Sequence, residues 1–250
     1  MGIFDRLFGS NKTSRGNSTS PAQATPVEKI SMSKHTENLN NVLIDMSKTS
    51  KVNMTKHNAR VALAMDYSGS MDLMFENGSV DDVVTRLLPI ALKFDDNGEM
   101  ESWLFSNSFE RLEPATIHNS ERYVKSVMLE SSMYMGGTSY APVLKDMIRY
   151  YKDKHPSDVP AFIIFITDGD NSDKRDTDAV IRELSNYNMF VQFVGIGNDS
   201  SFSYLKSLDN LSGRKHDNTG FISVKDMSKM SDNELYTELL RQYKDWLNNK

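Results

Sequence analysis

The sequence of 250 residues contains no cysteine. This absence excludes a disulfide framework and a cysteine-ligated zinc site, and it fits a reducing compartment, so we expect a cytoplasmic protein. Long hydrophobic runs are lacking as well. The longest apolar stretches, such as residues 161–166, have the length of a β-strand and not the ~20 residues of a membrane-spanning helix. Residues 1–8 mix acidic, basic and apolar side chains, which is not typical of a signal peptide.

An excess of positive charge is also absent. The formal net charge is −5, from 29 lysines and arginines against 34 aspartates and glutamates, and no basic face is evident. We therefore do not expect a nucleic-acid partner. With 38% hydrophobic and 25% charged residues, the composition suits one globular domain with an appendage.

The composition changes along the chain and predicts three segments. Residues 1–27 are expected to be a flexible N-terminal arm, because residues 9–27 are polar and have no periodic apolar face. Residues 28–58 are expected to be an N-terminal extension that packs on the domain. Residues 59–250 are expected to be the domain itself. The extension contains four apolar residues with the spacing of one helix face, which are Leu39, Val42, Leu43 and Met46.

The start of the arm has two interpretations. Its apolar residues have helical spacing and are Ile3, Phe4, Leu7 and Phe8. They could form a short amphipathic hook for a membrane or a partner protein. Alternatively, this start packs on the domain or on nothing, since so short a helix is marginally stable in water.

From residue 59 onward, strand patterns alternate with helix patterns. Strands are predicted at residues 60–65, 99–105, 110–112, 161–167, 190–196 and 220–224. Helices are predicted at residues 80–94, with Ser79 as N-cap, and at 120–129, 140–152, 176–187, 202–211 and 232–247. Because the central strands are almost continuously apolar, the fold class is a three-layer α/β fold, with an open, mostly parallel sheet and helices on both faces.

A cluster of oxygen-bearing side chains follows the first of these strands. Asp66, Ser68 and Ser70 form the pattern D-x-S-x-S and bring one carboxylate and two hydroxyls within five residues. Mg²⁺ and similar cations prefer oxygen ligands of this kind. Taken alone, the pattern equally suits an Asx-type turn that caps the next helix.

Two later segments favour the metal site. The Gly136-Gly137 pair places Thr138 in a loop just before a predicted helix, and the strand at residues 161–167 is followed by Asp168. In open parallel sheets, ligands bind beyond the carboxyl ends of the strands. Asp66 and Asp168 both fall at such ends.

The three motifs, in this order, resemble a von Willebrand factor A (vWA) domain with a metal-ion-dependent adhesion site (MIDAS). The resemblance covers residues 55–245, and the matching residues are Asp66, Ser68, Ser70, Thr138 and Asp168. Residues 87–96 and 103–109, together with the segment GGTSYAPV, also resemble the TerF-like group of bacterial tellurium-resistance proteins.

The resemblance implies a metal-dependent protein-binding module and not an enzyme. Its cation would be Mg²⁺, with Mn²⁺ or Ca²⁺ as alternatives. Ser68 and Ser70 would bind it directly, Thr138 directly or through water depending on the state, and Asp66 and Asp168 directly or through water. The remaining coordination position would take an acidic residue of a partner protein. The TerF-like likeness implies a setting in bacterial tellurite or stress resistance.

Two other functions stay open at this stage. A Mg²⁺-dependent phosphatase of the haloacid-dehalogenase type also starts from an aspartate at a strand end and uses a later acidic loop, which residues 166–173 would supply. However, such enzymes need a general acid two residues after the nucleophile, and Ser68 stands there; its hydroxyl cannot provide that proton at neutral pH. The other function is a vWA adaptor of an ATPase, which nothing in the sequence separates from a resistance role.

Several residues beside the motifs have competing interpretations. Asp170 and Asp173 are expected in a solvated loop, with outer-shell tuning of the metal or a second cation as the alternative. Tyr67 and Met71 are expected to shape the rim of the site. The methionines before the Gly-Gly pair are interpreted as core gap-fillers, with a methionine-rich contact surface as the alternative. These methionines are Met128, Met133 and Met135.

Overall fold

The computed structural model describes residues 32–250. The predictions of a flexible arm at residues 1–27 and of an apolar hook at its start lie outside the described residues.

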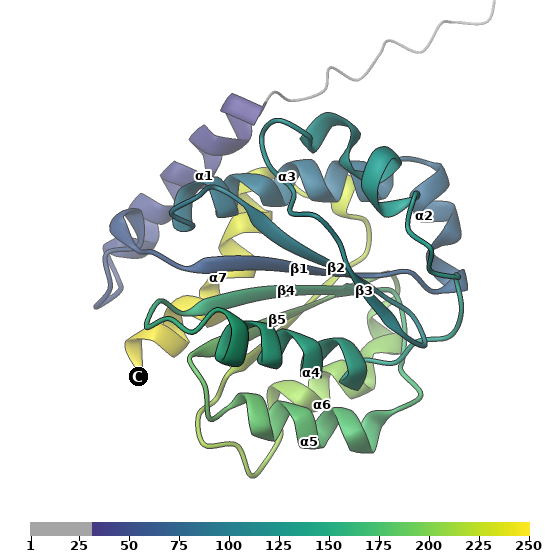
Figure 1. Cartoon of the computed structure of the whole chain (residues 1–250). Coiled ribbons are helices and arrows are strands. Elements are labelled where there is room, and N and C mark those ends of the chain that lie inside the picture. The colour runs from purple at the N-terminus through teal and green to yellow at the C-terminus, as the bar shows by residue number, and fades with distance from the viewer. Residues whose placement is uncertain (1–31) are drawn as a thin grey trace, which may run out of the picture.

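The core of the fold is a six-stranded sheet with the order β3-β2-β1-β4-β5-β6 (Figure 1). Its strands are β1 (Arg60–Asp66), β2 (Met100–Phe105), β3 (Phe109–Arg111), β4 (Ala161–Thr167), β5 (Met189–Ile196) and β6 (Thr219–Val224). All neighbouring pairs are parallel except β2 and β3, which form an antiparallel pair. The predicted open, mostly parallel α/β sheet is confirmed.

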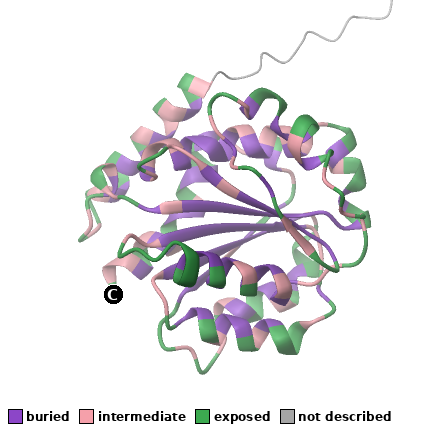
Figure 2. Ribbon diagram, in the orientation of Figure 1, coloured by how far each residue is buried: buried purple, intermediate pink, exposed green. Residues whose placement is uncertain are grey.

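Helices cover both faces of this sheet, as Figure 1 shows. The α-helices are α1 (Met32–Ser47), α2 (Asp72–Glu76), α3 (Ser79–Phe94), α4 (Ala141–Arg149), α5 (Lys174–Leu184), α6 (Ser203–Asp209) and α7 (Asp232–Asn248). Alternate residues of each central strand enter opposite cores: Leu63 contributes to the core under α1, α3 and α7, whereas Ala64 contributes to the core under α4, α5 and α6. Both faces of the central strands are therefore buried (Figure 2).

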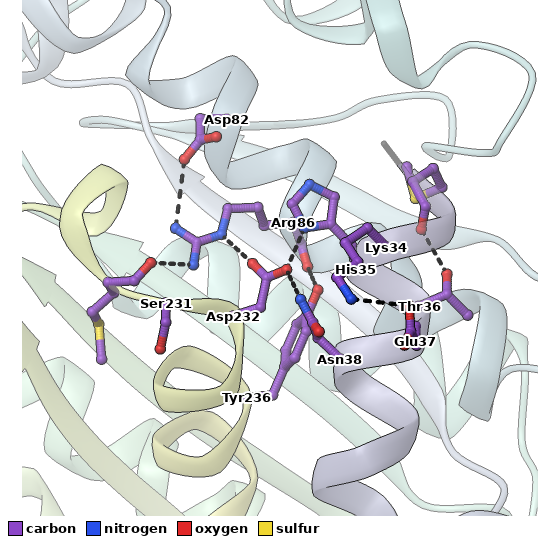
Figure 3. A network of polar contacts seen from close by, with 12 residues as sticks. Lys34, His35, Thr36, Glu37, Asn38, Asp82, Arg86, Ser231, Asp232 and Tyr236 are labelled. Carbon is purple, nitrogen blue, oxygen red and sulfur yellow. Dashed lines mark hydrogen bonds and ion pairs between the residues drawn. The ribbon is translucent and has the colours of Figure 1, made fainter. Parts of the chain in front are cut away.

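Helix α1 lies against α3 and α7, on one face of the sheet. It buries the four apolar residues whose spacing predicted one helix face, which are Leu39, Val42, Leu43 and Met46. Helix α1 also contributes polar side chains to a buried cluster centred on Asp232, the first residue of α7 (Figure 3).

The Asp232 carboxylate accepts hydrogen bonds from side chains of two other helices, α1 and α3. Arg86 Nε of α3 donates to Asp232 Oδ1 at 2.9 Å, and Asn38 Nδ2 of α1 donates to Asp232 Oδ2 at 2.9 Å. His35 Nδ1 lies 2.7 Å from the same Oδ2. The remaining guanidinium nitrogens of Arg86 donate to two backbone carbonyls in the segment before α7, at 2.6 and 2.7 Å. The cluster therefore joins α1, α3 and α7 through one carboxylate.

The two edges of the sheet are protected in different ways. At one edge, strand β3 contains only three residues, and short edge strands offer little backbone for pairing. At the other edge, the outward-facing N–H of Phe221 in β6 donates to Gln242 Oε1 of α7 at 2.9 Å. A side chain of the same domain therefore occupies a backbone donor that a further strand would need.

The helix predictions were wrong in four details. Ser79 is the first residue of α3 and not its N-cap; the cap position is Gly78, which has a φ of 80°, and Asn77 Oδ1 accepts from the Ser79 N–H at 2.9 Å. The segment predicted as a helix at 120–129 forms a short 3₁₀ turn and a π turn instead. The helix predicted to reach residue 152 ends as α4 at Arg149 and continues as a π turn. Helix α2 was not predicted, because five residues are too few to show a period.

Candidate metal site

Asp66 is the last residue of β1, and its carboxylate is fully buried. Its Oδ1 accepts a hydrogen bond from the Ser68 backbone N–H at 2.8 Å, which closes an Asx-type turn. Its Oδ2 accepts from Thr167 Oγ1, at the end of the neighbouring strand β4, at 2.6 Å. The turn places the next two hydroxyls at the carboxyl edge of the sheet.

Three further oxygens follow one another at that edge. Ser68 Oγ lies 3.1 Å from Ser70 Oγ, and Ser70 Oγ donates to Asp168 Oδ1 at 2.8 Å. In an octahedral Mg²⁺ complex with metal–oxygen bonds of 2.0–2.1 Å, adjacent ligand oxygens are separated by about 3 Å. The two separations are close to the edge length of such an octahedron. The donor set of hydroxyl and carboxylate oxygens therefore fits a hard divalent cation.

Thr138 arrives from a third segment, which the backbone holds against the first. Ser68 and Gly136 form a parallel bridge, and the Gly69 N–H donates to the Gly136 carbonyl at 3.0 Å. The Thr138 carbonyl accepts from the Ser172 N–H at 2.9 Å. Thr138 is thus placed between the D-x-S-x-S turn and the loop after β4, while its hydroxyl forms no hydrogen bond within residues 32–250 and lies outside the chain of linked oxygens.

The side chain of Asn107 approaches the Gly-Gly pair closely. A Cβ on Gly136 would lie 2.3 Å from Asn107 Oδ1, and a Cβ on Gly137 would lie 3.0 Å from Asn107 Nδ2. The same Oδ1 accepts from the Gly137 N–H at 2.6 Å. Asn107 therefore fixes the loop that carries Thr138. No sequence pattern marks Asn107, because it precedes Gly137 by 30 residues and lies in an ordinary polar loop.

Burial raises the pKa of Asp66 to about 6. Hydrogen bonds from Thr167 and Ser68 oppose this shift, and the negative charge of Asp168 adds to it. The carboxylate is therefore costly to keep ionised in the folded protein. A cation beside it would offset that cost by favouring the charged form.

Tyr140 supports the site through contacts with Thr167 and Gly169. Its hydroxyl donates to the Gly169 carbonyl at 2.7 Å and lies 3.2 Å from Thr167 Oγ1. Burial raises the pKa of Tyr140, so the phenol stays protonated and remains a donor. Tyr140 and Thr167 hold Asp66 and the Asp168 loop in place, and sequence analysis missed both.

The prediction of a solvated loop is wrong for Asp173. This side chain accepts from the backbone N–H groups of Tyr140 and Ala141, at 3.0 and 2.8 Å. It therefore caps the N-terminus of α4 from a segment that lies over 30 residues further along the chain. Asp170, in contrast, is exposed and forms an ion pair with Lys174.

Replacing Asp173 with alanine is expected to lower the free energy of unfolding by about 1–2 kcal/mol, because two N–H groups at the start of α4 lose their acceptor. Chemical denaturation of the wild type and the variant measures this difference. Asp170→Ala is the matched control, since it removes an exposed ion pair worth at most about 1 kcal/mol. Equal losses in the two variants would contradict the capping role.

The rim prediction for Tyr67 and Met71 is also wrong. Met71 is fully buried and Tyr67 is 8% exposed, and both belong to the core under α1, α3 and α7. Tyr67 packs edge-to-face on Phe75 of α2. Tyr67 and Met71 therefore anchor the D-x-S-x-S turn to the core. Met128, Met133 and Met135 join the same core, the first fully buried and the others partly, as the gap-filler interpretation predicts.

Residues 58–250 match the model of the vWA-TerF-like family, which is described as the vWA found in the C terminus of TerF. The chain belongs to this family. The chain is also 40% identical over 212 residues to the uncharacterized protein YcbR of Bacillus subtilis (strain 168). The match covers 82% of this chain and 86% of YcbR.

Solved structures share the fold of this vWA-TerF-like protein at low identity. The SpRpn10 VWA domain has a TM-score of 0.52 at 12% identity, over 74% of this chain and 95% of that one. An aerotolerance-related membrane protein from Bacteroides fragilis NCTC 9343 has a TM-score of 0.53 at 15% identity, over 75% and 99%. Proximal thread matrix protein 1 from the mussel byssus, with a zinc-occupied MIDAS motif, has a TM-score of 0.51 at 14% identity. That match covers 75% of this chain but only 46% of the mussel protein.

The candidate site differs in composition from a cluster of acidic, histidine or cysteine ligands. Among residues 32–250, no group of three or more histidine, cysteine, aspartate or glutamate side chains is placed to hold a metal ion. The candidate site instead combines two carboxylates with three hydroxyls. In the same range, no helix has the length and apolar character needed to cross a membrane.

Proposed function

We propose that this protein is a metal-dependent protein-binding module. Its divalent cation, Mg²⁺ with Mn²⁺ or Ca²⁺ as alternatives, would be held by five residues, which are Asp66, Ser68, Ser70, Thr138 and Asp168. The observation that carries the proposal is the succession of Ser68, Ser70 and Asp168 oxygens at separations of 3.1 and 2.8 Å, which match adjacent ligands of one small cation.

The charges of the site suit an acidic partner. Asp66 and Asp168 would balance the two positive charges of the cation, so the loaded site would carry no surplus negative charge to repel a carboxylate. The metal would supply a Lewis-acidic position for the partner's oxygen. The hydroxyls of Ser68 and Ser70 contribute neutral oxygens, which orient the cation without adding charge. A glutamate or aspartate of the partner is the natural remaining ligand, because it brings both an oxygen and a charge.

The family supports a proposal for the cellular setting. Membership of the vWA-TerF-like family supports a role in bacterial tellurite or stress resistance, in the cytoplasm, with another protein of that system as partner. The net charge of −5 argues against nucleic acid as the partner.

Metal-dependent partner capture tests this function. Immobilised wild-type protein is exposed to a lysate of the encoding organism in Mg²⁺ or in excess chelator, beside the Thr138→Ala variant. We expect a partner that is retained in Mg²⁺ and released by the chelator, because its carboxylate coordinates the cation. Thr138→Ala should weaken retention by about tenfold if that hydroxyl is a ligand in the bound state. Undiminished retention in chelator would rule out this site as the point of contact.

A hydrolytic role is not expected. The position of the general acid is held by Ser68. We therefore expect no turnover of p-nitrophenyl phosphate with Mg²⁺ or Mn²⁺. Turnover that depends on the metal and disappears in Asp66→Asn would instead establish the phosphatase.

A further inference from the structure

We propose that Leu73 and Tyr134 are apolar contact points on the two segments that meet at the candidate metal site, and that they select partner segments in which one carboxylate is flanked by large apolar side chains. This inference rests on the proposed function and adds the chemistry of the partner to it.

The exposure of these two residues is unusual for their type. Leu73 is 68% exposed and Tyr134 is 89% exposed. Among the exposed large hydrophobic residues of the range 32–250, these are the two highest values. Exposed apolar groups that gather beside a polar site are typical of interaction surfaces. Tyrosine in particular offers a large contact area at a low cost in conformational entropy.

Leu73 is presented by a firmly anchored element. It lies on α2, three residues after Ser70, and the residues two positions before and after it, Met71 and Phe75, are buried in the core. The helix cannot turn Leu73 inward without bringing Met71 or Phe75 out of the core. Its exposure is therefore a property of the fold.

Tyr134 is presented in a similar way from the loop that carries Thr138. Its two neighbours, Met133 and Met135, are partly buried and pack against the core. Its own carbonyl accepts a hydrogen bond from Ser106 Oγ at 3.1 Å. With both neighbours and the backbone held, the phenol ring is directed to solvent.

The two residues belong to the two segments that meet at the candidate site. Gly69 donates to the Gly136 carbonyl, so the two segments touch at this point. Leu73 is about one helical turn beyond Gly69, and Tyr134 is two residues before Gly136. Chain geometry therefore limits the separation of their Cα atoms to about 18 Å, the span of about six extended residues. Ser68 and Ser70 stand at the junction of the two segments, so a central carboxylate could reach the cation while its flanks contact both residues.

The surrounding charges specify one carboxylate rather than several. Asp72 and Glu76 on α2 are exposed. These acids would repel a highly acidic segment. A loaded site with two carboxylates and a divalent cation has no net charge and exerts little long-range attraction. Affinity beyond the single coordination bond must then come from apolar contact, which Leu73 and Tyr134 provide.

A peptide array tests the proposal. Its members are 15-residue peptides in a glycine–serine background, with a central Asp, Glu or Asn, and with Leu, Phe, Ser, Lys or Glu at the second and third positions on either side. The wild-type protein is applied in Mn²⁺ and in chelator. We expect retention of the Asp and Glu peptides with Leu or Phe flanks in Mn²⁺, at least about tenfold above their Ser-flanked counterparts.

Three variants locate the contact. Leu73→Ser and Tyr134→Ser should each reduce retention of the apolar-flanked peptides by about fivefold to tenfold, while Mn²⁺ binding measured by calorimetry stays unchanged. Ile44→Ser is the matched control, because Ile44 is an exposed apolar residue (49% exposed) on α1. It should behave as the wild type.

The outcomes separate this proposal from the function on which it rests. Metal-dependent retention of acidic peptides with no preference for their flanks would overturn the role of Leu73 and Tyr134 and leave the metal-dependent function standing. A flank preference that persists in both variants would also overturn it. Retention of no peptide in Mn²⁺, or equal retention of Asn and Asp peptides, would count against both. A Mn²⁺-dependent dimer that Leu73→Ser abolishes would replace the peptide partner by a second copy of the chain.

Discussion

Replacing Asp232 with alanine is expected to lower the free energy of unfolding by about 3–5 kcal/mol, the range for breaking a buried ion pair by removing one partner. The carboxylate is the common acceptor for Arg86, Asn38 and His35. Its removal leaves the buried guanidinium of Arg86 with only the half-exposed carboxylate of Asp82, 3.7 Å away, as a counter-ion in a low-dielectric region. It also releases the polar contacts that tie α1 and α3 to the start of α7 (Figure 3).

Urea denaturation of the wild type and Asp232→Ala measures the difference. The control is Glu238→Ala, on the same helix, which removes an exposed pair with Arg241 at 3.6 Å and should cost at most about 1 kcal/mol. Losses of equal size would show that the buried cluster is not a special source of stability.

The contribution of Asp232 should also depend on pH. Burial alone would raise its pKa, but hydrogen bonds from Asn38 and His35 and the charges of His35 and Arg86 outweigh it and hold the pKa below its ordinary value. A lowered pKa means that the folded state favours the ionised form. The stabilisation is therefore complete above the unfolded-state pKa of about 3.9 and is lost as the pH falls through the folded-state value. The gap between wild type and variant should narrow below pH 4.

The second large effect concerns the metal. Asp66→Asn is expected to abolish calorimetrically detectable binding of Mg²⁺ and Mn²⁺, because it removes one of the two carboxylates that balance the cation. The same substitution should leave the metal-free protein at least as stable as the wild type. The pKa of Asp66 is raised by burial to about 6, so ionisation at pH 7 costs the folded state free energy that the neutral asparagine avoids.

Thermal denaturation with and without metal makes the two effects visible together. Saturating Mn²⁺ should raise the melting temperature of the wild type and leave that of Asp66→Asn unchanged, since only a ligand that binds the folded state stabilises it. Asp170→Asn is the matched control: it is an exposed acid in the loop after β4 and should bind metal as the wild type does. Wild-type affinity in Asp66→Asn would remove this carboxylate from the site.

The mostly parallel direction of the strands could be predicted from the sequence, since β1, β4 and β5 are almost uninterrupted apolar runs. Their order in the sheet could not, because apolar runs do not show which strands are neighbours. The candidate site residues could also be proposed from their motifs, since Asp66 and Asp168 fall at strand ends and Thr138 follows the Gly-Gly pair. The contacts that bring these residues together are harder to recognise in the sequence. The Asp173 cap and the Asn107 contact each join segments 30 or more residues apart, and no local pattern marks the pairing.

The buried cluster was the largest feature that sequence analysis missed. Asp232 and Arg86 are 146 residues apart, and Asp232 and His35 are 197 apart. Each charged residue occurs within an amphipathic helix, where a polar side chain ordinarily faces water. Only the packing of α1 across α3 and α7 turns these side chains inward. Periodicity finds the faces of helices, but it does not reveal which polar residue will be covered by another helix.

The two protected edges of the sheet limit the ways in which this protein can bind other proteins. Strand β3 is only three residues long, and the Phe221 N–H already donates to Gln242. Both edges of the sheet therefore disfavour pairing with an additional strand. Recognition by backbone pairing, which tolerates many sequences, is thereby disfavoured. Under the proposed function, a partner would bind at the carboxyl end of the sheet, and its selectivity would depend on individual side chains and on the proposed cation.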